Sequence, residues 1–186
     1  MSLVDLISQA DERGLAASGL ACLDRCLPLL GGDDETLRPL WGNLADSAGD
    51  AGETWGDLLD AVRGKLPAGE DADDEATLLA QRMLAAAPDE RCAPQVRVWA
   101  DACSVASLQI HRLLDPAEDA SGVDARREGR TDGMSPLVAA ELRRQVTVLE
   151  VLAEHGPSGL RRALDVSTEG RRVLRAVVSR RARGRV

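Results

Sequence analysis

The chain has 186 residues, a formal net charge of −8 and neither phenylalanine nor tyrosine. It holds 28 alanines, 27 leucines and 22 arginines but only two isoleucines, a composition that favours helices and lacks the residues that pack pleated sheets. A β-rich fold is therefore excluded, and no apolar run approaches the ~18 residues that a membrane span needs.

Apolar periodicity predicts six helices in the first two thirds of the chain. Their expected ranges are 3–13, 15–30, 37–44, 53–66, 75–87 and 93–114. Gly14 is expected to end the first helix, and Asp33 or Asp34 to cap the third. Residues 46–52 are predicted to form a loop, and residues 67–74 an acidic connector.

The rest of the chain begins with a polar stretch, 115–135, that is predicted to be a long loop. Ser135-Pro136 is a favourable start for a helix over 136–155, which Gly156-Pro157 should end. A short helix over 159–164, a turn at 165–167 and a final helix over 168–182 are expected to follow.

Charge divides the chain into two parts. Residues 1–120 carry 23 acidic and 9 basic residues, net −14, whereas residues 121–186 carry 8 acidic and 14 basic residues, net +6. We expect one all-α domain over 1–186, an irregular bundle of about seven to nine helices. Its acidic part (1–114) should pack against its basic helical part (136–186). The predicted core residues are Trp55, Leu58, Val62, Val96, Trp99, Cys103, Ile110, Leu142, Val146 and Leu149.

Cys22 and Cys26 share one side of a predicted helix and could offer two thiolates to a metal ion. A structural zinc site needs four ligands, usually with a second closely spaced pair, and Cys92, Cys103 and His111 do not form one. Free thiols packed as small apolar groups are the simpler interpretation. An early acidic residue and no basic region predict that the N-terminus is not a secretory signal, which favours the cytoplasm.

Residues 149–175 suggest a helix, a Gly-Pro break, a short helix, an Asp-Val-Ser turn and a basic helix. This order resembles the helix-turn-helix of bacterial DNA-binding regulators, most visibly at 160–167. The resemblance implies that the last helix enters the major groove. The sequence departs from the motif at Arg161, Asp165 and Arg171, where a small residue, glycine and an aliphatic residue are usual. The candidate contacts to nucleic acid or an acidic partner are Arg162, Arg171, Arg172 and Arg175.

No recognised catalytic, phosphate-binding or metal-binding motif is present, so the sequence predicts no catalytic residue, cofactor or metal ion. The preferred hypothesis is a non-enzymatic helical scaffold or regulatory protein that binds another macromolecule, either a protein partner or a second copy of itself. Two alternatives stay open: a DNA-binding regulator with a degenerate helix-turn-helix at 157–182, and an enzyme without a recognisable motif. Because the acidic body repels phosphate, we expect the C-terminal arginines to pair mostly with its carboxylates.

Overall fold

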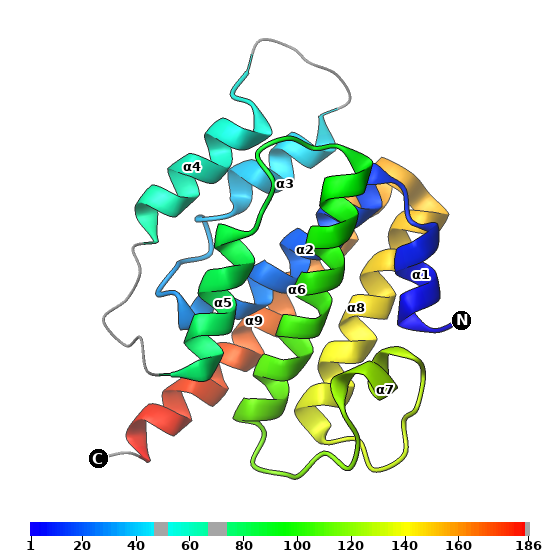
Figure 1. Cartoon of the computed structure of the whole chain (residues 1–186). Helices are drawn as coiled ribbons and strands as arrows, with labels where there is room; N and C mark the ends of the chain where they lie inside the picture. The colour runs from blue at the N-terminus through cyan, green and yellow to red at the C-terminus, as the bar shows by residue number, and fades with distance from the viewer. Residues whose placement is uncertain (47–51, 67–73, 185–186) are drawn as a thin grey trace.

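The computed structural model describes residues 1–46, 52–66 and 74–184 (Figure 1). These ranges hold nine α-helices, two short 3-10 helices and no strand, which confirms the all-α prediction. None of the described helices is both long and apolar enough to cross a membrane. The α-helices are α1 (Leu3–Gln9), α2 (Glu12–Cys26), α3 (Arg38–Ala45), α4 (Trp55–Lys65), α5 (Glu75–Ala85), α6 (Ala93–Leu114), α7 (Val123–Arg127), α8 (Pro136–His155) and α9 (Leu160–Arg183). The 3-10 helices are η1 (Leu27–Leu29) and η2 (Gly156–Gly159). Most of the predicted loop at 46–52 and of the connector at 67–74 lies outside the described residues.

Helix α2 is the centre of the bundle. Every residue from Gly14 to Cys26 is buried, and α6, α8 and α9 all pack against it (Figure 1). Alanine, glycine, serine and cysteine alternate with leucine along α2, so neighbouring helices can approach it from several sides. Helix α6 comes close to it at Gly19, where an added Cβ would lie 2.7 Å from the Trp99 ring.

Helices α6 and α8 span the predicted ranges 93–114 and 136–155. Nine of the ten predicted core residues are buried, and Val146 is partly buried at the edge of the core. The Trp55 and Trp99 rings meet edge to face, with their centroids 6.2 Å apart. The Trp99 indole also donates a hydrogen bond to the Met83 carbonyl at 2.9 Å, which fixes its position.

The predicted boundary between the first two helices is wrong. Helix α1 ends at Gln9, and Gly14 lies in the first turn of α2. The Asp11 carboxylate accepts a hydrogen bond from the Gly14 amide at 2.7 Å, so a new helix starts before the glycine that was expected to stop the old one. The Arg97 side chain from α6 donates to the Ile7 and Ser8 carbonyls, at 2.7 and 2.9 Å, and so satisfies the end of α1.

The predicted turn at 165–167 is also wrong, because α9 runs unbroken from Leu160 to Arg183. Asp165-Val166-Ser167 contains neither glycine nor proline, and the Ser167 hydroxyl donates to the Ala163 carbonyl at 2.9 Å within the helix. Five of the six buried residues of α9 recur at steps of three and four, and the sixth is Arg171. The five are Leu160, Ala163, Ser167, Gly170 and Leu174. One continuous face therefore packs on α2 and α8, and the two-helix arrangement of a helix-turn-helix is absent from this segment.

The segment 115–135 contains the short helix α7 and is not the uniform loop that was predicted. Arg126 is buried at its centre and donates to the Asp119 carboxylate at 2.7 Å and to the Arg130 and Asp132 carbonyls at 2.8 Å. The other Asp119 oxygen accepts from the Ser135 amide at 3.0 Å. A buried ion pair thus replaces the apolar residues whose absence suggested a loop.

Candidate functional site

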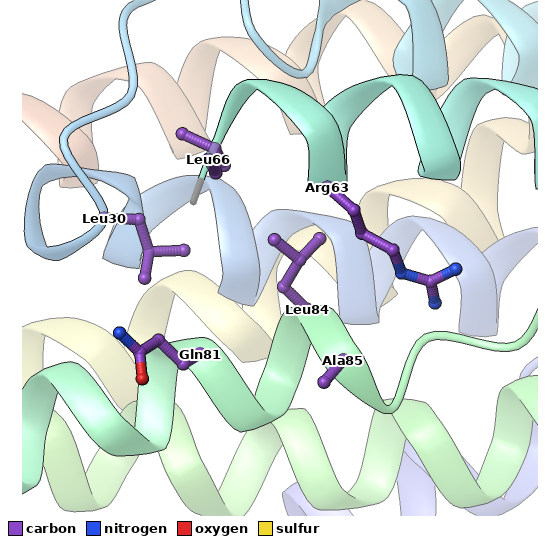
Figure 2. A pocket seen from close by; sticks show the side chains of 6 residues that line it. All are labelled: Leu30, Arg63, Leu66, Gln81, Leu84 and Ala85. Carbon is purple, nitrogen blue, oxygen red and sulfur yellow. The ribbon is translucent and has the colours of Figure 1, made fainter. Parts of the chain in front are cut away.

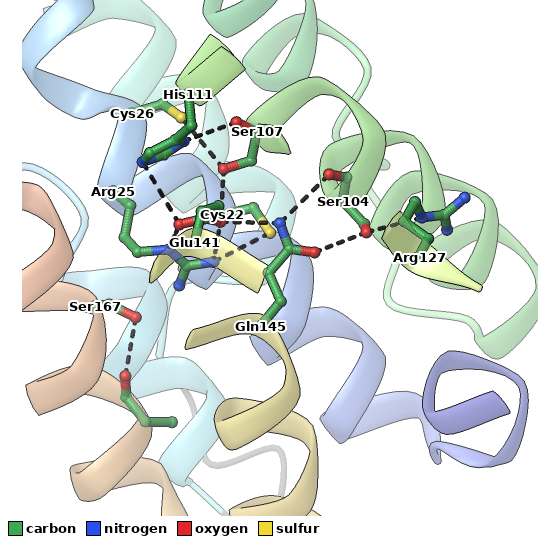
Figure 3. Close-up of polar contacts among 11 residues, drawn as sticks. Cys22, Arg25, Cys26, Ser104, Ser107, His111, Arg127, Glu141, Gln145 and Ser167 are labelled. Atoms are coloured by element: carbon green, nitrogen blue, oxygen red, sulfur yellow. Dashed lines mark hydrogen bonds and ion pairs between the residues drawn. The ribbon is translucent and has the colours of Figure 1, made fainter. Parts of the chain in front are cut away.

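A fully buried ion pair joins α2 to α8 at the centre of the bundle (Figure 3). The side chains of Arg25 and Glu141 both have no exposed surface. Arg25 Nε lies 2.8 Å from Glu141 Oε2, and Arg25 Nη2 lies 2.7 Å from Glu141 Oε1. This two-pronged geometry is the strongest that a guanidinium and a carboxylate can form. Neither residue is among those predicted from the sequence to form a functional site.

Two more side chains donate hydrogen bonds to Glu141, and a third supports one of them. The Ser107 hydroxyl and the Gln145 amide donate to Glu141 Oε1 at 2.7 and 2.9 Å. The Ser104 hydroxyl in turn donates to Gln145 Oε1 at 2.7 Å. These residues lie on the inward faces of α6 and α8. In the sequence they are polar residues at the same helical spacing as the buried apolar residues, and this spacing could have predicted that they are buried.

His111 closes the network on α6. Its Nδ1 lies 2.7 Å from the Ser107 carbonyl, which can only accept, so Nδ1 carries a proton. Its Nε2 lies 3.6 Å from Glu141 Oε2. Burial lowers the pKa of His111 below its ordinary value, against the opposing effect of the Glu141 carboxylate. His111 is therefore neutral at neutral pH.

Glu141 stays charged despite its burial. Burial by itself would raise the pKa of this carboxyl, but the Arg25 charge and the hydrogen bonds from Arg25 and Gln145 outweigh it and lower the pKa to about 2. The network thus balances one buried cation with one buried anion. Such an arrangement specifies how α2, α6 and α8 fit together, and it offers no free acid or base to a substrate.

We expect acidification to destabilise the protein in two stages. The unfolded chain binds a proton at His111 near pH 6.5 and the folded chain does not, so stability should fall below that pH by at most about 1.4 kcal/mol per pH unit. Glu141 adds a second loss between about pH 4.5 and about pH 2. Urea unfolding from pH 8 to pH 4 measures the first stage, which His111→Asn should remove. A wild-type stability that stays flat between pH 7 and pH 5 would contradict the neutral state of His111.

Three of the four free cysteines are buried in this region. Burial raises the pKa of the Cys22 thiol to about 12, and it also raises the pKa values of Cys26 and Cys103. Because the thiolate is the form that attacks and that binds metals, these thiols are poorly suited to either role. In the described ranges, no three histidine, cysteine or acidic side chains are grouped as a metal site would require. The absence of a tightly bound metal stays a prediction.

The four arginines predicted as contacts lie in different environments along α9. Arg171 is buried and bonds the Asp24 carboxylate, and its Nε lies 3.1 Å from Asp34 Oδ1. Arg175 is half-exposed and also pairs with Asp34, at 3.0 Å. Arg162 and Arg172 lie on the exposed side of the helix. The four side chains therefore do not form one exposed surface.

Two apolar grooves open on the α5 side of the bundle. Figure 2 shows the groove between α4 and α5, of about 340 Å³, which is lined by Leu30, Leu66, Leu84 and Ala85 together with Arg63 and Gln81. The Arg63 guanidinium already binds Asp60, Asp89 and the Ala87 carbonyl, so it offers no free charge to a ligand. A smaller groove of about 140 Å³ lies between α5 and α6.

A larger groove, of about 680 Å³, lies between α1, the start of α2 and the last turns of α8. We call it the α1–α8 groove. Its apolar lining residues are Met1, Leu6, Ala10, Leu149, Leu152 and Ala153. Its acidic lining residues are Asp11, Glu150 and Glu154, and none of the lining side chains is basic. The α1–α8 groove therefore combines an apolar floor with a carboxylate rim.

Comparison of the chain with protein-family models, with curated proteins and with solved structures finds no match.

Proposed function

We propose that this chain is a non-enzymatic helical module of the cytoplasm that binds a segment of another protein in the α1–α8 groove. The observation that carries the proposal is the part of the apolar lining that reaches solvent. Met1 and Ala153 are exposed, and Leu6 and Ala10 are partly exposed, above the buried Leu149 and Leu152. Apolar surface that faces water beside a polar rim is typical of sites where proteins meet. The groove volume of about 680 Å³ can hold several large side chains.

The chemistry of the interior supports a binding role over a catalytic one. Catalysis needs groups with perturbed pKa values at a surface that a substrate can reach. Here Glu141, His111 and Cys22, whose pKa values are shifted, are buried and bonded to one another or to their immediate neighbours. Exposed carboxylates such as Asp33 and Asp57, in contrast, have pKa values lowered by local hydrogen bonds that cap turns and helices. The arrangement of the buried groups stabilises one packing of the helices, which is what a rigid scaffold requires.

A peptide-selection experiment tests the proposal. Peptides selected from a random library on the folded protein should bind the α1–α8 groove, because its floor gains most from losing contact with water. Ala153 is an exposed residue of the groove, so Ala153→Arg should block it and weaken the selected peptides by about tenfold or more. Ala61→Arg, at an exposed position of α4, should leave binding unchanged. Peptides that bind both variants equally would place the binding site elsewhere and contradict the proposal.

A further inference from the structure

The charged side chains that line the α1–α8 groove are all acidic, and the Met1 α-amino group is the one positive group of its lining residues. Asp11, Glu150 and Glu154 line it, and no lysine or arginine side chain does. Glu150 and Glu154 are four residues apart on α8, so they share one helix face, and like charges at this spacing repel each other. Both are exposed. No described lysine or arginine forms an ion pair with these three carboxylates, and His155 Nε2 lies 3.8 Å from Glu154 Oε2.

The backbone contributes the ends of two helices to this groove. Helix α8 ends at Gly156, whose positive φ of 54° turns the chain away, and Gly156 is itself part of the groove lining. The C-terminus of a helix carries about half a negative charge from its unpaired carbonyls. The negative end of α8 thus lies beside the carboxylates of its last turns, whereas the positive end of α2 is capped by the Asp11 carboxylate, which accepts from the Gly14 amide. The net attraction for cations therefore comes from Glu150 and Glu154 and the end of α8.

From this complementarity, and resting on the proposed function, we infer that the partner segment is a basic amphipathic helix of another protein. Such a helix presents apolar residues at steps of three and four along one face and lysines or arginines beside them. Its apolar face would cover Leu6, Ala10 and Ala153, and its cations would reach Glu150 and Glu154. The rim charges would steer the encounter and fix the orientation of the bound helix.

Three model peptides test this inference. All share one pattern of leucines and differ only at the flanking positions, which are lysine, glutamine or glutamate. Fluorescence anisotropy of the labelled peptides, at low salt and near physiological ionic strength, gives their affinities for the full chain. We expect the lysine peptide to bind about tenfold more tightly than the glutamine peptide at low salt, and the difference to shrink as the Debye length falls. The glutamate peptide should bind most weakly.

Two double variants of equal net charge separate the rim from the general acidity of the protein. Glu150→Gln/Glu154→Gln should weaken the lysine peptide by about three- to tenfold and leave the glutamine peptide unchanged. Glu53→Gln/Glu118→Gln neutralises two exposed carboxylates outside the groove and should have little effect on either peptide.

The outcomes distinguish this inference from the proposed function. If the lysine and glutamine peptides bind equally and both lose affinity in Ala153→Arg, the groove binds protein segments but the inferred partner chemistry is wrong. If the two double variants weaken the lysine peptide equally, the attraction comes from overall charge and the inference is again wrong. If no peptide responds to Ala153→Arg, both proposals fail.

Discussion

Replacing Glu141 by glutamine should destabilise the protein by about 3–5 kcal/mol, because it leaves the Arg25 cation buried without its counter-charge. Both side chains are fully buried. A loss of this size is a large part of the 5–15 kcal/mol that typically stabilises a domain. Urea or thermal unfolding followed by circular dichroism measures it.

Two further variants show whether the buried charge is the cause. Arg25→Met/Glu141→Gln removes both charges and should recover much of the lost stability, although Ser107 and Gln145 would keep imperfect hydrogen bonds. Glu35→Gln breaks the exposed Arg38–Glu35 pair, whose side chains are 69% and 64% exposed, and should change stability by less than about 1 kcal/mol. Equal losses of stability in Glu141→Gln and Glu35→Gln would show that the buried ion pair contributes no more to stability than the exposed one.

Replacing Gly19 by valine should destabilise the protein by about 3 kcal/mol, through overpacking of the core. A Cβ at this position would lie 2.7 Å from the Trp99 ring. That ring cannot move freely, because its indole nitrogen is bonded to Met83. We expect a lower unfolding midpoint together with a shifted tryptophan emission spectrum in the folded protein.

Gly42→Val is the matched control. Gly42 is an exposed glycine inside α3 with no atom within 4 Å of an added Cβ. Valine there replaces a poor helix former with a slightly better one, so stability should be unchanged or rise by a few tenths of a kcal/mol. Comparable losses at Gly19 and Gly42 would mean that helix propensity, and not the contact with Trp99, governs both changes.

The buried network around Glu141 could have been predicted in part from the sequence, whereas the α1–α8 groove could not. The network had a local signal, since Ser104, Ser107 and Glu141 occupy inward positions of helices that were correctly predicted. These polar residues are missed when only apolar residues are used to find the buried face of a helix. The groove had no local signal, because its walls come from α1 and from the end of α8, which are far apart in the chain.

The sequence by itself determined the fold class, most helix positions and most of the core. Composition excluded sheets, and the spacing of apolar residues is a property of each helix alone, so α6 and α8 were predicted from end to end. Predictions from local sequence were wrong where a tertiary interaction stabilised a different structure. The segment around Arg126 has too few apolar residues to suggest a helix, yet it holds the short helix α7 and a buried ion pair between Arg126 and Asp119.

Only the tertiary structure decided the roles of the charged residues. Arg171 reads locally as a misfit in a DNA-binding motif, but in the fold it meets Asp24, 147 residues earlier in the chain. Arg25 likewise meets Glu141 across 116 residues. The sequence around a charged residue does not indicate which distant residue will pair with it. Burial of the charge becomes favourable only when the fold places an opposite charge beside it with the right geometry. The helix pattern is therefore encoded locally, whereas the charge pairing that locks the helices together appears only in the assembled bundle.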